Sequence, residues 1–151
     1  MSLGNGEDHR CVAYKSGKVA CWGYYNSSGQ LGDGTKLGSS KPVAVVGLPG
    51  PAVEVSAGEG ASCARIANGE VWCWGRGQYG QLGYGEWWDS WSPVQVKDLK
   101  GAVALARSWR SFCALRVDGS VWCWGTDGAS SGVWGAGNTP VPKPIKASLP
   151  P

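Results

Sequence analysis

The segment CWGRGQYGQLGYG (residues 73–85) decides the fold, because related segments occur three times along the chain. The first copy is CWGYYNSSGQLGDG (residues 21–34), and the third is CWGTDGASSGVWGAG (residues 123–137). A second shared block precedes each copy, and these blocks begin at Cys11, Cys63 and Cys113. Successive blocks are offset by 52 and then 50 residues. A period of this length is the signature of a repeat architecture.

The composition excludes several classes of protein. The chain has 151 residues, of which 25 are Gly, 10 are Trp and only 17% are charged, so we expect one domain of short strands with little helix. The net charge of +3 comes without a Lys/Arg cluster and does not imply a nucleic-acid surface. No run of 18 apolar residues predicts a membrane span. The start, MSLGNGEDHR, has no hydrophobic signal region, which leaves the compartment undetermined.

The middle repeat predicts four short antiparallel strands. These are AVEVSAG (52–58), CARI (63–66), EVWCWG (70–75) and PVQVKDL (93–99). A long Gly-rich loop with the insert EWWDSW (86–91) joins the last two. Four strands per repeat is the size of one β-propeller blade. The predicted fold is therefore an all-β chain of three blades, at about 4–51, 52–101 and 102–151.

The cysteines fit this geometry. A three-residue hairpin loop that ends in Gly, such as Val-Asp-Gly at residues 117–119, is a common type I turn followed by a bulge. The register set by each such turn places the two cysteines of its hairpin directly opposite each other, within reach of a disulfide. We therefore predict three disulfides within blades: Cys11–Cys21, Cys63–Cys73 and Cys113–Cys123.

Two other roles for the cysteines remain open. They could be reduced, buried side chains that act as small hydrophobes. A metal site is disfavoured because no close C-x-x-C or C-x-x-H pair occurs. Disulfides would favour an extracellular or periplasmic location, because such compartments are oxidising.

The repeats look incomplete at the ends of the chain. Almost no residue before Cys11 corresponds to the AVEVSA strand, so we expect three blades that lack one strand. Closed propellers have about 4–8 blades, and three blades cannot close a ring. Two copies would give a six-bladed ring, so we predict a homodimer.

The repeated motifs resemble those of the regulator of chromosome condensation family. They are C-A-L-x-x-D-G-x-V-x-C-W-G, then G-Q-L-G-x-G, then P-x-x-V, and they span essentially the whole chain. The resemblance implies a β-propeller that serves as a protein-interaction platform. Relatives in that family include an exchange factor for a small GTPase and, more distantly, β-lactamase inhibitory protein II. The third repeat departs from the pattern, because SGVWGAG replaces G-Q-L-G-x-G.

Residues that recur in every repeat are predicted to be structural. Trp22, Trp74 and Trp124 are expected in the core between blades. Gly32, Gly83 and Gly135 are expected to serve backbone turns.

Residues that do not recur are the candidates for function. In an antiparallel meander, the loop between the first two strands and the loop between the last two lie at the same end. The loops of this end also carry Glu7, Asp8, His9, Arg10, Asn26, Glu59, Arg76, Thr126 and Asp127. The predicted binding residues there are Tyr24, Tyr25, Tyr79, Trp87, Trp88, Asp89, Trp91, Trp109 and Arg110. Trp, Tyr and Arg dominate binding hot spots, and loops on a rigid scaffold are where function concentrates.

We therefore predict a non-catalytic interaction module that binds a protein partner through this aromatic face. The alternatives are a carbohydrate-binding propeller, whose sugar stacks on Trp, and a self-assembling structural unit. The insert 86–91 could also fold its aromatic rings back onto the blade. His9 beside Asp8 could in principle act as a general base, but no nucleophile motif accompanies it, so His9 is expected to be an ordinary loop residue. No catalytic residue, cofactor, metal, nucleic-acid or membrane partner is expected.

Overall fold

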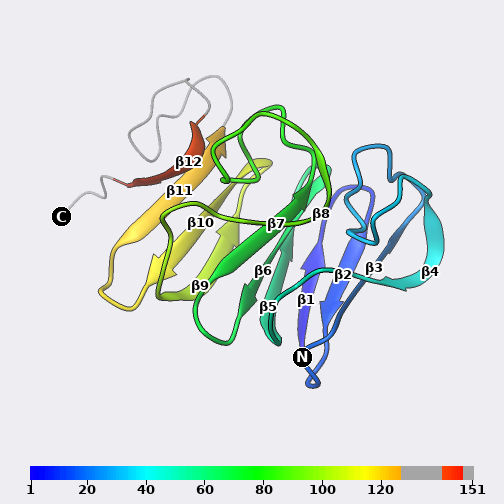
Figure 1. Cartoon of the computed structure of the whole chain (residues 1–151), viewed down its shortest axis with the longest axis horizontal. Helices are drawn as coiled ribbons and strands as arrows, with labels where there is room; N and C mark the ends of the chain where they lie inside the picture. The colour runs from blue at the N-terminus through cyan, green and yellow to red at the C-terminus, as the bar shows by residue number, and fades with distance from the viewer. Residues whose placement is uncertain (127–140, 148–151) are drawn as a thin grey trace.

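A computed structural model describes residues 1–126 and 141–147, and it consists of three four-stranded antiparallel sheets. The sheets follow one another along the chain, and the strands within each sheet lie in sequence order (Figure 1). The prediction of an all-β fold built from propeller blades is confirmed.

The twelve strands divide evenly among three blades. Blade 1 contains β1 (Ser2–Asn5), β2 (Arg10–Ala13), β3 (Val19–Gly23) and β4 (Ser39–Ala44). Blade 2 contains β5 (Ala52–Ala57), β6 (Ala61–Ile66), β7 (Val71–Gly75) and β8 (Ser90–Gln95). Blade 3 contains β9 (Ala102–Arg107), β10 (Arg110–Arg116), β11 (Val121–Thr126) and β12 (Val141–Lys146). The first strands of neighbouring blades contact each other, β1 with β5 and β5 with β9.

The hairpin geometry confirms the predicted cysteine pairs. The turns between the second and third strands end in Gly17, Gly69 and Gly119, whose φ angles are 82°, 82° and 78°. In each hairpin the two cysteines face each other across the strands. The Sγ atoms of the pairs Cys11–Cys21, Cys63–Cys73 and Cys113–Cys123 are 2.12, 2.09 and 2.07 Å apart, which is bonding distance. Each disulfide therefore joins two strands of the same blade.

Blade 1 has its first strand, contrary to the sequence prediction. Residues 2–5 form β1, and Gly4 faces Cys11 in the same register in which Ser56 faces Cys63. The segment has no alternating apolar pattern, but strand pairing requires only backbone groups. The Ser2 hydroxyl adds a link to blade 2, because it accepts a hydrogen bond from the Val55 N–H at 3.3 Å.

The fourth strand of blade 2 also differs from the prediction. It was expected at residues 93–99, whereas β8 runs from Ser90 to Gln95 and takes in the end of the tryptophan insert. The pairing crosses an irregularity between Cys73 and Gly75, after which Gly75 faces Ser90. Pro93 is tolerated inside β8 because this strand lies at the edge of its sheet.

The core lies between the blades, and the recurring tryptophans fill it. Trp74 and Trp124 are fully buried. Each reaches back into the preceding blade, where its indole N–H donates to a backbone carbonyl, that of Gln30 for Trp74 and that of Gln81 for Trp124, both at 3.0 Å. The prediction of inter-blade packing is confirmed for these two residues.

Gly32 and Gly83 are required by this packing as well as by the backbone. Both have positive φ angles, 70° and 68°. A Cβ on Gly32 would lie 2.6 Å from the Trp74 indole nitrogen, and one on Gly83 would lie 2.7 Å from Cδ1 of Trp124. The corresponding Gly135 lies outside the described residues.

The outer face of blade 1 repeats the pattern of these interfaces, but no neighbouring blade covers it within residues 1–126 and 141–147. Trp22, which corresponds to Trp74, is only partly buried. Leu3 is 64% exposed, whereas Val55 at the equivalent position of blade 2 is 3% exposed. Completion of a ring by a second copy stays a prediction.

Candidate functional site

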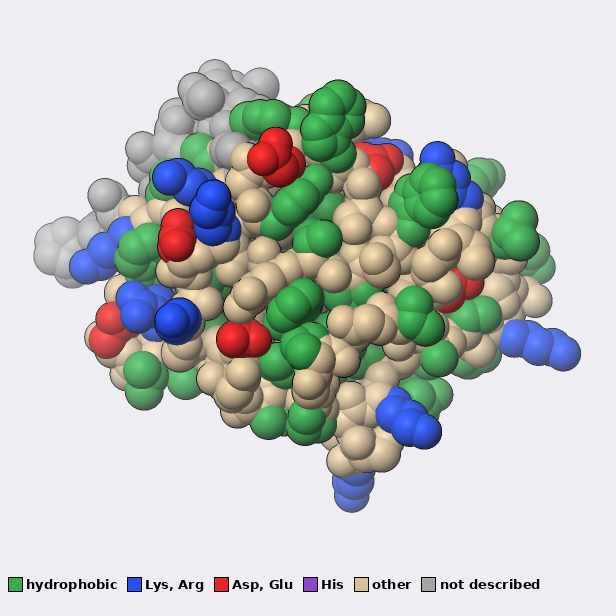
Figure 2. All heavy atoms as spheres, viewed as in Figure 1, with side chains coloured by type: hydrophobic (Ala, Val, Ile, Leu, Met, Phe, Trp, Pro, Cys, Tyr) green, Lys and Arg blue, Asp and Glu red, His purple; other side chains and the backbone are tan. Residues whose placement is uncertain are grey.

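The long loops gather at one end of the blades. In Figure 1 the loops that join β1 to β2, β3 to β4, β5 to β6 and β7 to β8 lie along the upper edge, and the tight hairpin turns lie at the lower edge. Hydrophobic side chains stand out from this upper edge in the space-filling view (Figure 2). We call this edge the loop end.

Five residues from blades 2 and 3 form what we call the arginine cluster. Its members are Glu59, Arg76, Tyr79, Trp109 and Arg110. Arg110 pairs with the Glu59 carboxylate, and Arg76 donates to the same carboxylate at 2.8 Å. The Arg110 guanidinium also lies 4.3 Å from the ring centre of Tyr79 and 4.3 Å from that of Trp109. One arginine is thus held by a carboxylate and two aromatic rings at the surface.

The electrostatics of the cluster follow from these contacts. The hydrogen bond from Arg110 lowers the pKa of the Glu59 carboxyl below its ordinary value, and the nearby charges of Arg110 and Arg76 add to this against the effect of partial burial. The same hydrogen bond raises the pKa of Arg110. Glu59 is therefore ionised at neutral pH, and its one carboxylate is shared by two arginines.

A second group lies where blades 1 and 2 meet, and we call it the tryptophan pocket. The pocket has a volume of about 540 Å³. Its lining residues are Lys36, Gln78, Trp87, Trp88, Asp89 and Trp91. Lys36 comes from blade 1, and its ammonium nitrogen lies 4.5 Å from the ring centre of Trp91.

Backbone contacts hold the walls of the tryptophan pocket in place. The Gly34 N–H donates to the Trp91 carbonyl at 3.0 Å, across the two blades. The Asp89 Oδ1 atom accepts a hydrogen bond from the Gly77 N–H at 2.9 Å. The Tyr84 hydroxyl donates to the Trp88 carbonyl at 3.0 Å. The insert is therefore anchored by backbone groups and by the Asp89 carboxylate, while Trp87, Trp88 and Trp91 remain 43%, 74% and 44% exposed.

The structure thus divides the predicted binding residues into two groups. Tyr79, Trp109 and Arg110 meet in the arginine cluster, whereas Trp87, Trp88, Asp89 and Trp91 line the tryptophan pocket. Tyr24 and Tyr25 are 81% and 66% exposed and line neither group. Thr126 ends β11, and Asp127 lies outside the described residues.

Four further residues of the two groups are absent from the predicted binding set. Lys36 and Gln78 lie on the loops between third and fourth strands, and Glu59 and Arg76 were assigned only to the loop end in general. Their signal in the sequence is weak: they are polar loop residues, and Glu59 has a counterpart in Glu7, which also lies four residues before the first cysteine of its blade. The contacts among these residues depend on how neighbouring blades pack together. The sequence of a single repeat does not specify that packing.

His9 is not an ordinary loop residue, because it is buried between blades 1 and 2 with only 1% exposure. Its Nε2 atom lies 2.7 Å from the Ser62 hydroxyl, which in turn donates to the Gln30 carbonyl at 3.1 Å. Since the Ser62 proton is used, His9 Nε2–H is the donor and Nδ1 carries a lone pair, which has no partner among the described residues. Burial lowers the pKa of His9 to about 4, helped by the charges of Arg10 and Arg107.

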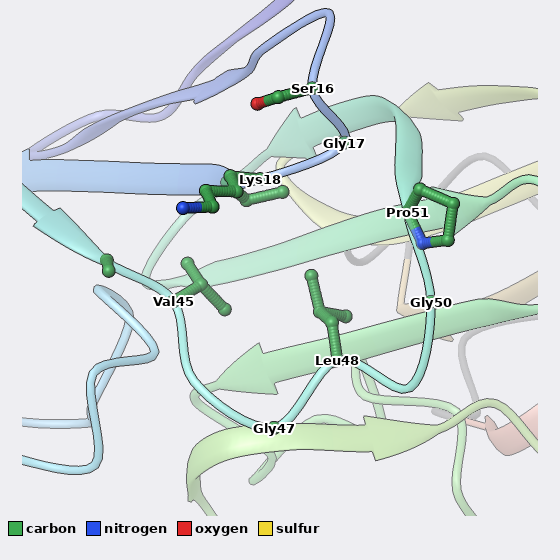
Figure 3. A pocket seen from close by; sticks show the side chains of 10 residues that line it. Ser16, Gly17, Lys18, Val45, Gly47, Leu48, Gly50 and Pro51 are labelled. Atoms are coloured by element: carbon green, nitrogen blue, oxygen red, sulfur yellow. The ribbon is translucent and has the colours of Figure 1, made fainter.

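The opposite end of the molecule holds a hollow in blade 1 of about 460 Å³ (Figure 3). It lies between the turn at Gly17 and the segment that follows β4, and Val45 and Leu48 border it. Blade 3 has the corresponding hollow, lined by residues 118–121, 146 and 147. Because it recurs where a hairpin turn meets a fourth strand, we assign it to the architecture of the blade.

Other kinds of site find no support in the described part of the chain. No group of three or more His, Cys, Asp or Glu side chains there is placed to hold a metal ion. No helix within residues 1–126 and 141–147 is long and apolar enough to cross a membrane.

Fold and site together define a class: a β-propeller repeat protein whose blades each carry a disulfide and whose non-repeating residues gather on the loops of one end. The sequence pattern of the regulator of chromosome condensation (RCC1) repeat matches residues 16–65 and 68–114, and a second pattern of that repeat matches residues 52–81. The chain belongs to the regulator of chromosome condensation repeat family.

Relatives and solved structures agree with this assignment. The chain is 34% identical over 103 residues to human E3 ubiquitin-protein ligase HERC2, and the match covers 67% of this chain but 2% of the ligase. It is also 34% identical over 103 residues to the ultraviolet-B receptor UVR8 of Arabidopsis thaliana, covering 67% of this chain and 23% of the receptor. The chain thus spans only a small part of these relatives.

The fold is similar to that of human WBSCR16, with a TM-score of 0.82 and 24% identity over 99% of this chain and 39% of that protein. It is also similar to Prp20p from Saccharomyces cerevisiae, with a TM-score of 0.81 and 20% identity over 97% of this chain and 38% of the yeast protein. At these identities the similarity establishes the fold.

Proposed function

We propose that this chain is a non-catalytic β-propeller interaction module that binds a protein partner through the aromatic loop end, centred on the arginine cluster. The observation that supports this most is Arg110, which contacts Tyr79, Trp109 and Glu59 at once. Contacts from three different loops hold this side chain in place before any partner arrives. A preorganised surface avoids the entropy cost of ordering side chains on binding, and Tyr, Trp and Arg are the residues that dominate hot spots.

Similar structures support a protein partner. Prp20p is described together with its binding to Gsp1p and histones, and another structure contains Kap60 bound to yeast RCC1 (Prp20). These partners belong to the yeast protein. A distant relation to β-lactamase inhibitory protein II stays a prediction.

The three disulfides lead us to propose an oxidising compartment, extracellular or periplasmic, as the place of binding. The partner is therefore expected among secreted or surface proteins.

The proposal is tested by affinity capture with the purified chain, followed by calorimetry with the captured partner. The double variant Trp109→Ala/Arg110→Ala should weaken binding by about tenfold or more, because it removes the centre of the proposed surface. The variant Val117→Ser is the matched control, since Val117 is 77% exposed but lies in a tight turn at the opposite end. Equal affinities of the wild type and the double variant, or equal losses in both variants, would contradict the proposal.

A further inference from the structure

The tryptophans of the pocket differ from the structural tryptophans in how their indole groups are satisfied. Four tryptophans that pack within or between the blades donate their N–H groups within the protein: Trp72 to Glu70, Trp74 to Gln30, Trp122 to Ser120 and Trp124 to Gln81. Trp87, Trp88 and Trp91 donate to no group among the described residues. They are 43%, 74% and 44% exposed, although their backbone is anchored. The insert therefore presents flat aromatic surfaces with free donors.

The space between these rings has the dimensions of a small-ligand site. Its volume of about 540 Å³ falls in the range of roughly 300–1,000 Å³ that is typical of such sites. The corresponding segment of blade 1, TKLGSS (residues 35–40), has the same length and the same strand register but contains no tryptophan. Blade 1 folds its own loop without these rings, so we infer that the insert has a role other than closing a blade.

The polar lining identifies the chemistry of the ligand. Asp89 uses Oδ1 for the Gly77 N–H, which leaves Oδ2 as an acceptor beside the pocket. Gln78 is exposed and offers both a donor and an acceptor, and Lys36 offers donors. Lys36 also covers one face of Trp91, so Trp87 and Trp88 are the available stacking surfaces. Opposite charges on Lys36 and Asp89 favour a ligand without net charge.

We propose that the tryptophan pocket binds a neutral carbohydrate, whose ring stacks on Trp87 or Trp88 and whose hydroxyl groups pair with Asp89, Gln78 and Lys36. A pyranose ring offers an apolar C–H face for an indole and hydroxyls that both donate and accept hydrogen bonds. A proline-rich segment would also pack on tryptophan, but its prolines have no N–H to donate to the Asp89 carboxylate, which would then lose solvation without compensation. This site goes beyond the proposed protein-binding function and uses different residues.

The test is a titration of ¹⁵N-labelled protein with a panel of neutral oligosaccharides of glucose, xylose, mannose and N-acetylglucosamine, followed through the indole N–H signals. Single Trp→Phe variants assign the signals. We expect at least one sugar to shift the signals of Trp87 or Trp88 while those of the buried Trp74 and Trp124 stay in place. The unmoved signals also report that the fold is intact.

Variants define the site further. At least one of the variants Trp87→Ala and Trp88→Ala should weaken sugar binding by about tenfold, because it removes the stacking surface. Asp89→Asn should weaken it while keeping the Oδ1 acceptor for Gly77. Trp109→Ala is the matched control, since it removes an exposed tryptophan of the loop end outside the pocket, and it should bind sugar as the wild type does.

Three outcomes would overturn the inference: no shift with any sugar up to about 10 mM, which is well above a Kd of about 1 mM; a sugar affinity that is unchanged in both Trp87→Ala and Trp88→Ala; or binding of decaproline in place of sugars. Each outcome is independent of the protein-binding proposal. Loss of a protein partner in Trp109→Ala/Arg110→Ala leaves the sugar site intact, and the reverse also holds.

Discussion

Blade 1 meets blade 2 through His9 and Ser62, whereas the corresponding positions between blades 2 and 3 hold Ala61 and Phe112. Around these positions both interfaces keep one buried tryptophan bonded to a carbonyl of the preceding blade at 3.0 Å. The first interface adds a buried hydrogen bond of 2.7 Å, and the second adds the ring of Phe112, which stacks at 6.2 Å on Trp124. The tryptophan contact is therefore common to both interfaces. The residues that pack beside it differ, and they are polar in the first interface and apolar in the second.

The largest expected effect on stability comes from removing the buried tryptophan of an interface. Trp74→Ala and Trp124→Ala should each lower the free energy of unfolding by about 3–5 kcal/mol, because each opens a cavity and removes a buried hydrogen bond to a carbonyl of the preceding blade. Denaturant titration measures this loss. Trp22→Ala is the matched control at the same repeat position, and it should cost less because Trp22 is partly exposed. Equal losses in all three variants would show that the interfaces do not depend on this contact.

Removing a disulfide should have the next largest effect on the free energy of unfolding. It also tests whether the interfaces between blades depend on the bonds within blades. Replacing Cys63 and Cys73 together with Ala should lower the free energy of unfolding by about 3 kcal/mol, as expected for closing a loop of about ten residues. Because the bond lies within blade 2, the indole signals of Trp74 and Trp124 should remain those of packed side chains under native conditions. Loss of those signals in the folded variant would mean that the bond also supports the interfaces.

The smallest effect distinguishes the two interfaces by pH. The pKa of His9 falls from 6.5 to about 4 on folding, so the unfolded chain binds a proton that the folded chain does not between these values. The contribution of His9 to the free energy of unfolding is complete above about pH 6.5 and is lost as the pH falls toward about 4. From pH 7 to about pH 4.5 the loss amounts to about 2.5 kcal/mol.

The His9→Gln variant should lack this part of the pH dependence, and denaturant titrations of both proteins at the two pH values measure the difference. A constant difference in stability between wild type and variant at both values would contradict a buried neutral His9. No corresponding effect is expected at the second interface, where Ala61 and Phe112 do not titrate.

Features set by residues close together in the sequence could be predicted, whereas features set by contacts between blades could not. The cysteine pairs follow from the sequence, because a three-residue turn sets the register of a hairpin within about ten residues. The strand β1 does not, because it pairs through its backbone and its side chains carry no alternating pattern. The aromatic residues of the loop end are visible as departures from the repeat. Their division into the arginine cluster and the tryptophan pocket is not, because Arg110 meets Glu59, and Lys36 meets Trp91, only across neighbouring blades.

The confinement of each disulfide to one hairpin has a consequence for how such chains change over generations. A duplicated or deleted repeat carries both of its cysteines, so the number of blades can change without leaving an unpaired thiol. Cysteines ten positions apart also leave the ribosome or a secretion channel almost together, and the right partner is the nearest one. Oxidation can therefore proceed blade by blade, with few chances for mispairing, however long the array becomes.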